Sequence, residues 1–561
     1  MPVLDSYQLT AAGAVMRLLL PILAVVLLVR LGHSLLFHRN LKEVWAWLIL
    51  PDGKRLAITH WENTLGSRKS CDLCLKGEKI SPVHAVLTRM DDGTWVVTDA
   101  DSKKGIVVGG KKVQSATVKY GQNITLGDVK VKLEPFGEKQ QEKQTRFRQK
   151  EGGPLRPFVT IFTLTAFQIC LMTASLASAE EKLPIFLCAM ALVVGEWGLF
   201  FLYRIFHRKG FEVESVAFFL CSVGQCVVAS SAPNELYKQT ATIFLGVGLF
   251  LLVGWMLRNQ KRIRWMRPVA AVGGLALLIF TLLFAKEVNG ARNWVFLGGM
   301  SFQPSELAKI CFVFVGTASL DTLVTRKNLL FFVIYTGAVC LCLALLSDFG
   351  TALVFFVCFL VIAFLRSGNF AAVTLTTAAA AFGGMLATRF LPYITRRFES
   401  WRHVWEHALT GGYQQTRSMM CIASGGLLGL GAGQGWLKYV AAADTDLVFA
   451  FVSEELGLIF ATLMVLYVVL LGVYVVRSAP LSRGCFQSIG ACAAVSILLT
   501  QTILNVFGTV DLLPLTGVTF PFVSNGGSSM LSAWGLLAFL KAVDTRQNAS
   551  FTVPRARRDD P

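Results

Sequence analysis

Apolar runs recur along most of this chain, and each is about as long as a helix must be to cross the hydrocarbon core of a bilayer. The first covers residues 10–31. The others lie at roughly 157–178, 184–205, 213–231, 239–257, 268–285, 305–320, 329–346, 349–365, 371–391, 447–473, 485–507 and 527–543. Hydrophobic residues make up 54% of the 561 residues, which is more than a soluble protein of this size needs to bury. The sequence therefore predicts a polytopic α-helical membrane protein.

The basic residues indicate how the chain is oriented. The formal net charge is +18, and most of it lies in short loops on alternating sides of the apolar runs, as the positive-inside rule describes. If basic loops such as 204–210 and 258–268 are cytoplasmic, the basic tail 546–561 is cytoplasmic as well. No folded face gathers these charges, so no nucleic-acid partner is expected. Residues 1–39 lack a small-residue cleavage site and are predicted to form an uncleaved transmembrane anchor.

One long polar region interrupts the apolar runs near the N-terminus. Within residues 40–136, short alternating stretches such as HAVLTRM and TWVVTDA predict strands, so we expect a small all-β sandwich in the cytoplasm. A basic linker at 137–156 and two additional helices within 157–209 follow it. Cys71 and Cys74 form a single CxxC, which supplies too few ligands for a structural zinc site. No metal is therefore predicted there.

The loop 392–446 breaks the charge rule, because it is predicted outside and yet carries several basic residues. A long loop is translocated regardless of its charge, which is one interpretation. The other is a basic surface for an anionic ligand, since arginine suits phosphate and pyrophosphate. Within this loop, RRFESWRHVWEH predicts an amphipathic helix along the interface. The glycine-rich segment 424–435 allows close backbone packing or a wrapped headgroup.

The stretch AAADTDLVFAFVSEELG places carboxylates at the mouth of an apolar run, where they are costly. Asp446 stands directly before the run and is the candidate general base for a hydroxyl nucleophile. The structural alternative is that Asp446, Asp444 and Thr445 only cap the helix. Glu454 and Glu455 lie about 12 Å further along the helix axis, and we expect them to tie the helix to its neighbours.

Further polar turns are predicted on the same outer side. NGARNW contains Arg292, and FQPSELAKI places Glu306 and Lys309 on one helical face. LSDFGTAL contains Asp348, and PFVSNGGSS, with Ser524, predicts a re-entrant turn that must line protein or a wet cavity. The alternative for Glu306 and Lys309 is a pair that only neutralises itself. Several polar turns on one side predict one shared cavity.

These motifs, in this order, resemble those of the SEDS family (shape, elongation, division and sporulation; RodA/FtsW type). The motifs are NGARNW, FQPSELAK, SDFGTALV, YQQTRS…SGGLLGLGAG, TDLVFAFVSEELG and N…PLTG…PFVSNGGSS. The resemblance covers 210–545 as a ten-helix core. It implies a peptidoglycan glycosyltransferase of the bacterial plasma membrane. Such an enzyme polymerises lipid II, a disaccharide-pentapeptide on undecaprenyl pyrophosphate, beside a class B penicillin-binding protein.

The resemblance also implies roles for individual residues. The family's essential aspartate corresponds to Asp446, and its glutamate and lysine correspond to Glu306 and Lys309. Its loop arginine corresponds to Arg292, and the aspartate of its QPDLGT motif corresponds to Asp348.

The chain departs from the family pattern at four places. Asn293 replaces an arginine, Ser347 replaces a proline, Asn525 replaces a tyrosine, and Arg417 replaces a glutamine. Arg417 and Ser524 are predicted to bind substrate together with the other turn residues. Each departure changes the expected fit of the headgroup, but none removes the base.

The polar region resembles a forkhead-associated (FHA) domain through LGSRKSCDLCL, ISPVHAVL and DSKKGIVVGGKKV. Such domains bind phosphothreonine, and the resemblance assigns that role to Arg68, Ser81 and His84. Ser67 stands where the family has its arginine, and Lys104 stands where it has an asparagine. The implied partner is a phosphoprotein of the division or elongation machinery. The alternative is a sandwich that only docks a cytoplasmic partner.

Together these features predict a mechanism and two rivals. Asp446 deprotonates the acceptor 4-hydroxyl, which attacks the donor's anomeric carbon as undecaprenyl pyrophosphate leaves. Arg292 and Arg417 stabilise the developing charge. A divalent cation, Mg²⁺ or Mn²⁺, is a candidate for sharing that task, although the sequence shows no dedicated cage.

Two other functions compete with this one. The first is a lipid II flippase, since intramembrane carboxylates also suit transport. The second is a non-catalytic scaffold.

Overall fold

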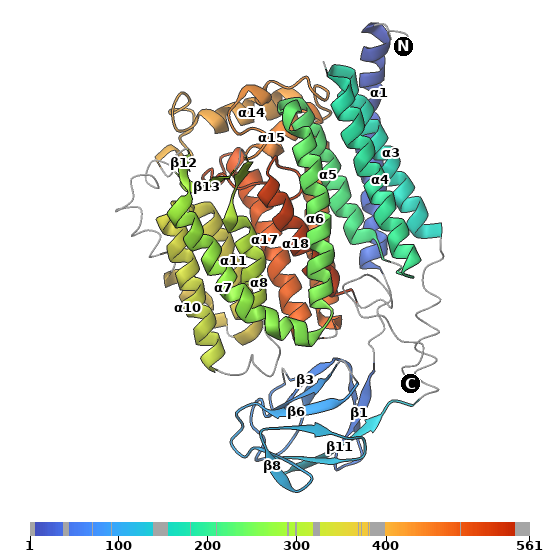
Figure 1. The fold of residues 1–561 in the computed structure, drawn as a ribbon, viewed down its shortest axis with the longest axis vertical. Helices are drawn as coiled ribbons and strands as arrows, with labels where there is room; N and C mark the ends of the chain where they lie inside the picture. The colour runs from blue at the N-terminus through green and yellow to red at the C-terminus, as the bar shows by residue number, and fades with distance from the viewer. Residues whose placement is uncertain are drawn as a thin grey trace.

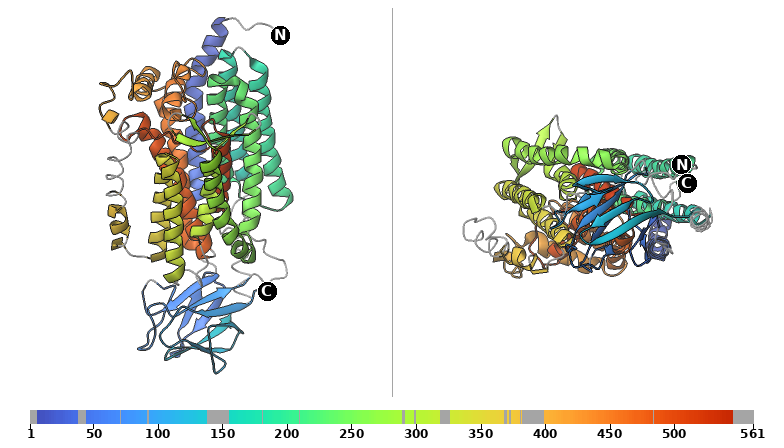
Figure 2. Two further views of the ribbon diagram at one scale, coloured as in Figure 1. Left: turned by 60° about the vertical axis from the view of Figure 1, so that its left-hand side comes forward. Right: turned by 90° about the horizontal axis from the view of Figure 1, so that it is seen from below.

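The computed structural model describes residues 6–37, 44–137, 155–208, 210–317, 326–367, 370–381 and 399–544, apart from 70, 91, 92, 180, 289, 290, 298, 299, 372, 380 and 483. They form a helical bundle with a β-sandwich at one end (Figure 1). Figure 2 shows the same arrangement from two further directions. We call the end of the bundle that points away from the sandwich the distal end. Helices α14 and α15 lie there (Figure 1).

Three helices form one side of the bundle, drawn in blue and teal in Figure 1. Helix α1 (Ser6–Leu36) packs against α3 (Leu155–Ser178) and α16. Helix α3 also packs against α4 (Lys182–Ile205) and α5. Because α1 precedes the sandwich in the chain and α3 follows it, the sandwich is an insertion between two neighbouring helices.

The remaining helices form the core of the bundle. They are α5 (Glu212–Ser231), α6 (Leu236–Leu257), α7 (Gln260–Phe284), α8 (Pro304–Gly316), α10 (Arg326–Leu345), α11 (Phe349–Ser367), α14 (Tyr413–Gly425), α15 (Val448–Glu455), α16 (Leu458–Ser478), α17 (Cys485–Thr509) and α18 (Gly527–Ala542). Among the described residues, nine helices are long and apolar enough to cross a membrane. Helix α5 is central, because 94% of its span is buried, against 22% for α7. The prediction of a multi-pass helical membrane protein is confirmed.

Two predicted helices differ from the structure. The run 447–473 is split, because Gly457 adopts a φ of 95° between α15 and α16. A Cβ on Gly457 would lie 2.4 Å from the carbonyl oxygen of Leu427, so only glycine allows the glycine-rich loop to pass here. Residues 401–412 form turns rather than an amphipathic helix. Arg402 adopts a φ of 62°, which ends a right-handed helix.

A small antiparallel sheet replaces the polar turn expected after α7. Strands β12 (Lys286–Val288), β13 (Ala291–Leu297) and β14 (Met300–Phe302) lie in that order and lead into α8. Most of the predicted run 371–391 lies outside the described residues.

The inserted domain is a sandwich of two sheets, as predicted. One sheet has the order β2-β1-β11-β10-β7-β8 and the other β4-β3-β5-β6-β9. Alternating side chains from both sheets, including Leu48, Leu87, Trp95 and Leu133, fill one apolar core. The strands are β1 (Ala46–Ile49), β2 (Arg55–Ile58), β3 (Glu62–Gly66), β4 (Leu73–Cys74), β5 (Ala85–Arg89), β6 (Trp95–Asp99), β7 (Ile106–Val108), β8 (Lys111–Val113), β9 (Ser115–Val118), β10 (Asn123–Leu126) and β11 (Val129–Pro135).

A buried ionic network joins the additional helices to the core. Nζ of Lys541 on α18 lies 3.1 Å from Oε2 of Glu214 on α5 and 3.6 Å from Oδ2 of Asp544. The hydroxyl of Tyr203 on α4 donates to Oε1 of Glu214 at 2.7 Å. Each buried charge of this network therefore has a partner, as a low-dielectric interior requires.

Candidate functional site

Asp446 lies at the distal end, two residues before α15 begins, and is partly exposed. Its backbone N–H donates to the carbonyl oxygen of Ala442 at 2.9 Å. Nδ2 of Asn505 on α17 donates to the carbonyl oxygen of Asp446 at 2.9 Å and to that of Val518 at 3.0 Å. Asn505 therefore fixes the main chain of Asp446 from a neighbouring helix.

A glycine lies beside the carboxylate of Asp446. Gly517 adopts a φ of 68°, and a Cβ there would lie 3.3 Å from Oδ2 of Asp446. Any other residue would be strained at this position and would crowd the carboxylate. The carboxylate thus packs against the main chain of the segment before the last helix.

The turn that contains Asp446 is hydrogen-bonded to the turn before α18. Oδ2 of Asp444 accepts from Nδ2 of Asn525 at 2.8 Å, and its carbonyl oxygen accepts from the N–H of Asn525 at 2.8 Å. The hydroxyl of Ser524 donates to the carbonyl oxygen of Thr445 at 2.6 Å and accepts from the N–H of Phe520 at 2.7 Å. Ser524 therefore holds the residue next to Asp446; its predicted contact with substrate stays a prediction.

In the structure, Asp444 and Thr445 make contacts other than a cap of α15. The N-cap of α15 is Leu447, which makes no side-chain cap, and the first turn of α15 has no acidic residue. Asp444 instead binds Asn525, and the hydroxyl of Thr445 donates to the carbonyl oxygen of Ala442.

Glu306 and Lys309 form a buried ion pair on α8. Nζ of Lys309 lies 2.6 Å from Oε1 of Glu306, and the two residues are 1% and 4% exposed. Oε2 of Glu306 has no hydrogen-bond partner among the described residues. A buried carboxylate oxygen without a donor is costly, so this atom is a candidate contact for a ligand.

Asp348 is held by intramolecular donors. Its Oδ1 accepts from the N–H of Thr351 at 3.1 Å, which is the pattern of an N-cap for α11. Its Oδ2 accepts from Nδ2 of Asn293 at 3.1 Å and from Nε2 of Gln303 at 3.2 Å. Asp348 thus joins β13 and the start of α8 to α11, and its predicted role in substrate binding stays a prediction.

These polar turns lie together, and the shared cavity predicted among them stays a prediction. The N–H of Gln303 donates to the hydroxyl of Ser528 at 2.9 Å, which joins the starts of α8 and α18. A Cβ on Gly350 would lie 2.9 Å from the carbonyl oxygen of Thr516, one residue before the Gly517 that packs on Asp446. The turns around positions 293, 303, 348, 446 and 525 therefore form one connected cluster, which we call the distal cluster.

Two arginines lie near the elements of the distal cluster. Arg292 is exposed on β13, and its backbone N–H donates to the carbonyl oxygen of Leu346 at 3.0 Å. Arg417 lies on α14, with its guanidinium 5.2 Å from the ring centroid of Tyr413. Neighbouring Gln414 donates from Nε2 to the carbonyl oxygen of Ala441 at 2.9 Å, so α14 contacts the turn that leads to Asp446.

The glutamate pair at the end of α15 ties this helix to its neighbours, as predicted, and its partners include the glycine-rich loop and the residues directly after it. Glu454 accepts from the N–H groups of Trp436 and Leu437, both at 2.9 Å. Glu455 accepts from the N–H of Gly433 at 2.9 Å and from the hydroxyl of Ser230 at 2.5 Å. The additional helices reach the same loop, because Arg17 donates to the carbonyl oxygen of Leu430 and Ser178 donates to that of Ala432.

The pKa of Glu455 predicts how the stability of the fold depends on pH. Helix α15 is not one of the candidate membrane spans found in the described part of the chain. Burial raises the pKa of Glu455 from 4.5 to about 7, although Ser230 and Gly433 donate to the carboxylate. The folded state therefore binds this proton more tightly than the unfolded state. The contribution of Glu455 to the free energy of unfolding should be fully present below pH 4.5 and fall by about 2 to 4 kcal/mol as the pH rises to 7.

Glu455→Gln should flatten this part of the profile, because the amide does not titrate. The measurement is the midpoint of thermal unfolding between pH 4.5 and 8 in detergent. Glu235→Gln is the control, at a glutamate whose side chain is 46% exposed. Equal slopes for Glu455→Gln and the unmodified protein would contradict the raised pKa.

Three residues of the sandwich are predicted to bind a phosphopeptide, and two of them, Ser81 and His84, are hydrogen-bonded to each other in its loops. The N–H of Ser81 donates to Nδ1 of His84 at 3.1 Å, and Nε2 of His84 donates to the carbonyl oxygen of Gly105 at 3.2 Å. The hydroxyl of Ser81 accepts from the N–H of Lys103 at 3.1 Å. Arg68 is exposed on the loop after β3. Burial raises the pKa of the Cys71 thiol, which donates to the carbonyl oxygen of Pro82.

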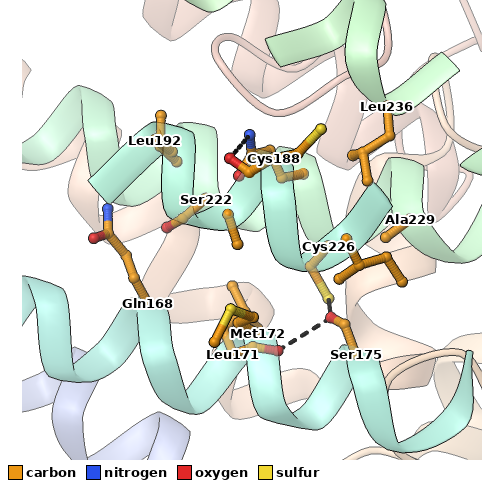
Figure 3. Close-up of a pocket in the computed structure, with 13 residues that line it drawn as sticks. Gln168, Leu171, Met172, Ser175, Cys188, Leu192, Ser222, Cys226, Ala229 and Leu236 are labelled. Carbon is orange, nitrogen blue, oxygen red and sulfur yellow. Dashed lines mark hydrogen bonds between the residues drawn. The ribbon is translucent and has the colours of Figure 1, made fainter. Parts of the chain in front are cut away.

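A small cavity lies away from the distal cluster, between α3, α4, α5 and α6 (Figure 3). Gln168, Ser175, Cys188 and Cys226 contribute to its lining. Its volume of about 30 Å³ has room for about one or two water molecules. It is too small for an organic ligand.

The fold and the distal cluster define a class of protein: a multi-pass membrane protein with an aspartate-centred polar site at one end of its bundle and a β-sandwich at the other. Residues 215–549 match the FtsW/RodA/SpoVE family model, described as cell cycle protein, and residues 63–127 match the FHA domain model. The chain belongs to the FtsW/RodA/SpoVE family, and its sandwich is an FHA domain.

Curated relatives agree with this assignment. The chain is 32% identical over 360 residues to the probable peptidoglycan glycosyltransferase FtsW of Tolumonas auensis, across 60% of this chain and 92% of the relative. It is 29% identical to the peptidoglycan glycosyltransferase RodA of Mycobacterium tuberculosis, across 54% and 69%. A chain of a solved peptidoglycan synthase complex is similar in fold, with a TM-score of 0.50 and 23% identity, across 60% of this chain and 97% of that one.

Several residues of the distal cluster do not stand out in the sequence. Asn505 lies near the end of an apolar run, and Gln303 precedes a helix without any special spacing. Asn293 and Asn525 stand out only as departures from the family pattern, yet both bind the aspartates of the cluster. A polar amide inside an apolar run is the signal that identifies Asn505, since such groups need a buried partner.

Proposed function

We propose that this chain is a peptidoglycan glycosyltransferase that polymerises lipid II at the outer face of the bacterial plasma membrane. The observation that carries the proposal is the placement of Asp446 in the distal cluster, with a partly exposed side chain and a main chain held by Asn505. The relatives named above carry the same activity in their names. The positive-inside rule supports a cytoplasmic sandwich and thus an outer distal end.

In the proposed reaction, Asp446 acts on the acceptor sugar. Its carboxylate takes the proton of the 4-hydroxyl, and the oxygen then attacks the anomeric carbon of the donor. The bond from that carbon to undecaprenyl pyrophosphate breaks, so the configuration at the carbon inverts. The partial exposure of Asp446 supports this role, because a base must reach its substrate.

The leaving pyrophosphate gains negative charge as the bond breaks. Arg292 and Arg417 are the proposed donors, because planar guanidinium groups match phosphate oxygens. Among the described residues, no three His, Cys, Asp or Glu side chains gather closely enough to hold a metal ion. We therefore assign no step to the divalent cation, which stays a prediction.

The experiment that tests this function separates polymerisation from transport. The purified full-length chain is incubated with lipid II, with and without a cognate class B penicillin-binding protein, and glycan chains are resolved by gel electrophoresis. We expect long chains with the partner present. A flippase would instead move labelled lipid II across proteoliposome membranes without forming sugar bonds, and a scaffold would do neither.

We also propose that the FHA domain binds a phosphothreonine-containing protein in the cytoplasm. Arg68, Lys103 and Lys104 are exposed on adjacent loops, beside the Ser81–His84 pair. Arg68→Ala should weaken binding of a phosphothreonine peptide by about 10- to 100-fold, because one charge-assisted contact is lost. The measurement is isothermal titration of the full chain with phosphorylated and unphosphorylated peptides. Lys111→Ala on β8 is the control, and equal affinities for both variants would contradict the assignment.

A further inference from the structure

The sandwich touches the bundle at the loop between α16 and α17. Nε2 of His60 donates to the carbonyl oxygen of Pro480 at 3.1 Å. The N–H of Cys485 donates to Oε2 of Glu62, the first residue of β3, at 3.1 Å. Glu62 is only 4% exposed, so this contact is part of a packed interface.

Cys485 is the first residue of α17, and the first N–H groups of a helix have no partner within it. The N-cap of α17 is Gly484, which has no side chain to accept a hydrogen bond, and the first turn contains no acidic residue. A carboxylate at this place is favoured by the helix dipole. Glu62 therefore supplies from the sandwich the cap that α17 lacks in its own sequence.

The C-terminal half of α17 contacts the distal cluster. Asn505 lies about 30 Å further along the helix axis than Cys485. It is 1% exposed and binds the main chain of Asp446. One helix thus joins the contact with the sandwich to the proposed catalytic base.

We propose that Glu62 of the FHA domain is a positioning residue for the glycosyltransferase core. By capping α17, it fixes the helix in the place where Asn505 holds Asp446 toward the substrate. The FHA domain is then a resident part of the active enzyme as well as a recruiting module. This inference rests on the proposed function of the distal cluster.

The test uses the full chain with its class B partner and three variants. Glu62→Ala removes the cap. Glu62→Gln keeps an amide oxygen that accepts from Cys485, so it is the conservative rescue. Glu134→Ala removes a more exposed carboxylate of the same domain and is the control. If Glu62→Ala fails to fold, Glu62→Asp replaces it, because the shorter side chain withdraws the oxygen from Cys485.

We expect Glu62→Ala to lower kcat for lipid II polymerisation about 3- to 10-fold, the factor expected for loss of one helix cap, with KM unchanged. Glu62→Gln should stay within about twofold of the unmodified chain, as should Glu134→Ala. Unchanged kcat in Glu62→Ala, or equal losses in the alanine and glutamine variants, would overturn the positioning role.

Hydrogen–deuterium exchange of residues 485–490 provides a readout without catalysis. Exchange there should rise about 3- to 10-fold in Glu62→Ala, because the first turn loses its cap. Unchanged exchange would overturn the capping contact. If the unmodified chain makes no glycan, the proposed function fails, and the exchange data still decide whether the sandwich caps α17.

Discussion

Asp446→Asn should reduce polymerisation of lipid II by about 100- to 10,000-fold, which is the usual contribution of a general base. Asparagine has nearly the same size as aspartate, and the backbone contacts with Ala442 and Asn505 do not involve the side chain. The variant should therefore fold and bind lipid II normally. The measurement is the initial rate of glycan formation, together with binding of labelled lipid II.

Asp444→Asn is the matched control, because it changes a carboxylate two residues away. Oδ2 of Asp444 accepts from Nδ2 of Asn525. An asparagine at this position keeps an amide oxygen that accepts, so the variant exchanges one charge-assisted hydrogen bond for a neutral one. We expect a loss of activity of about tenfold or less, because only the difference between a charge-assisted and a neutral hydrogen bond is lost. If both variants lose the same activity, or if Asp446→Asn is fully active, Asp446 is not the base.

The ion pair on α8 gives the second large effect. Lys309→Met leaves Glu306 as an unpaired buried charge, which should cost about 3 to 5 kcal/mol of stability. The double variant, with Glu306→Gln added, removes both charges and should recover more than half of that loss. The measurement is unfolding of both variants and of Glu306→Gln alone, as a double-mutant cycle.

Activity of the double variant separates the two interpretations of this pair. If Glu306 and Lys309 only neutralise each other, restored stability should restore polymerisation. No donor to Oε2 of Glu306 is found in the described part of the chain. If this atom contacts the substrate instead, the double variant should be stable but slow. A fully active double variant would remove Glu306 and Lys309 from the site.

The sequence predicts the elements of this fold better than the contacts between them. Apolar runs report membrane helices directly, because length and hydropathy are local properties. The polar turns before α8, α11 and α18 stand out for the same reason. The break at Gly457 does not, because it depends on the close passage of Leu427, which is distant in the sequence.

The same holds for the site: the sequence predicts its local motifs, but not its contacts between distant residues. Asp446 and the Glu306–Lys309 pair are recognisable from their motifs. The cap that Glu62 places on α17 is not, because it joins residues more than 400 positions apart. Position 293 shows the difference well: it is a departure in the motif, and yet in the structure its amide holds Asp348.

The packing of α1 against α3 has a further consequence for the FHA domain. Because the domain is inserted between these neighbours, two linkers attach it to the membrane near the same place. Attachment at both ends keeps its concentration near the loop between α16 and α17 at about the millimolar level. A docking contact too weak to measure between separate molecules is therefore occupied in the intact chain. Release of the domain should therefore require cuts in both linkers, because one remaining linker still keeps it near its docking site.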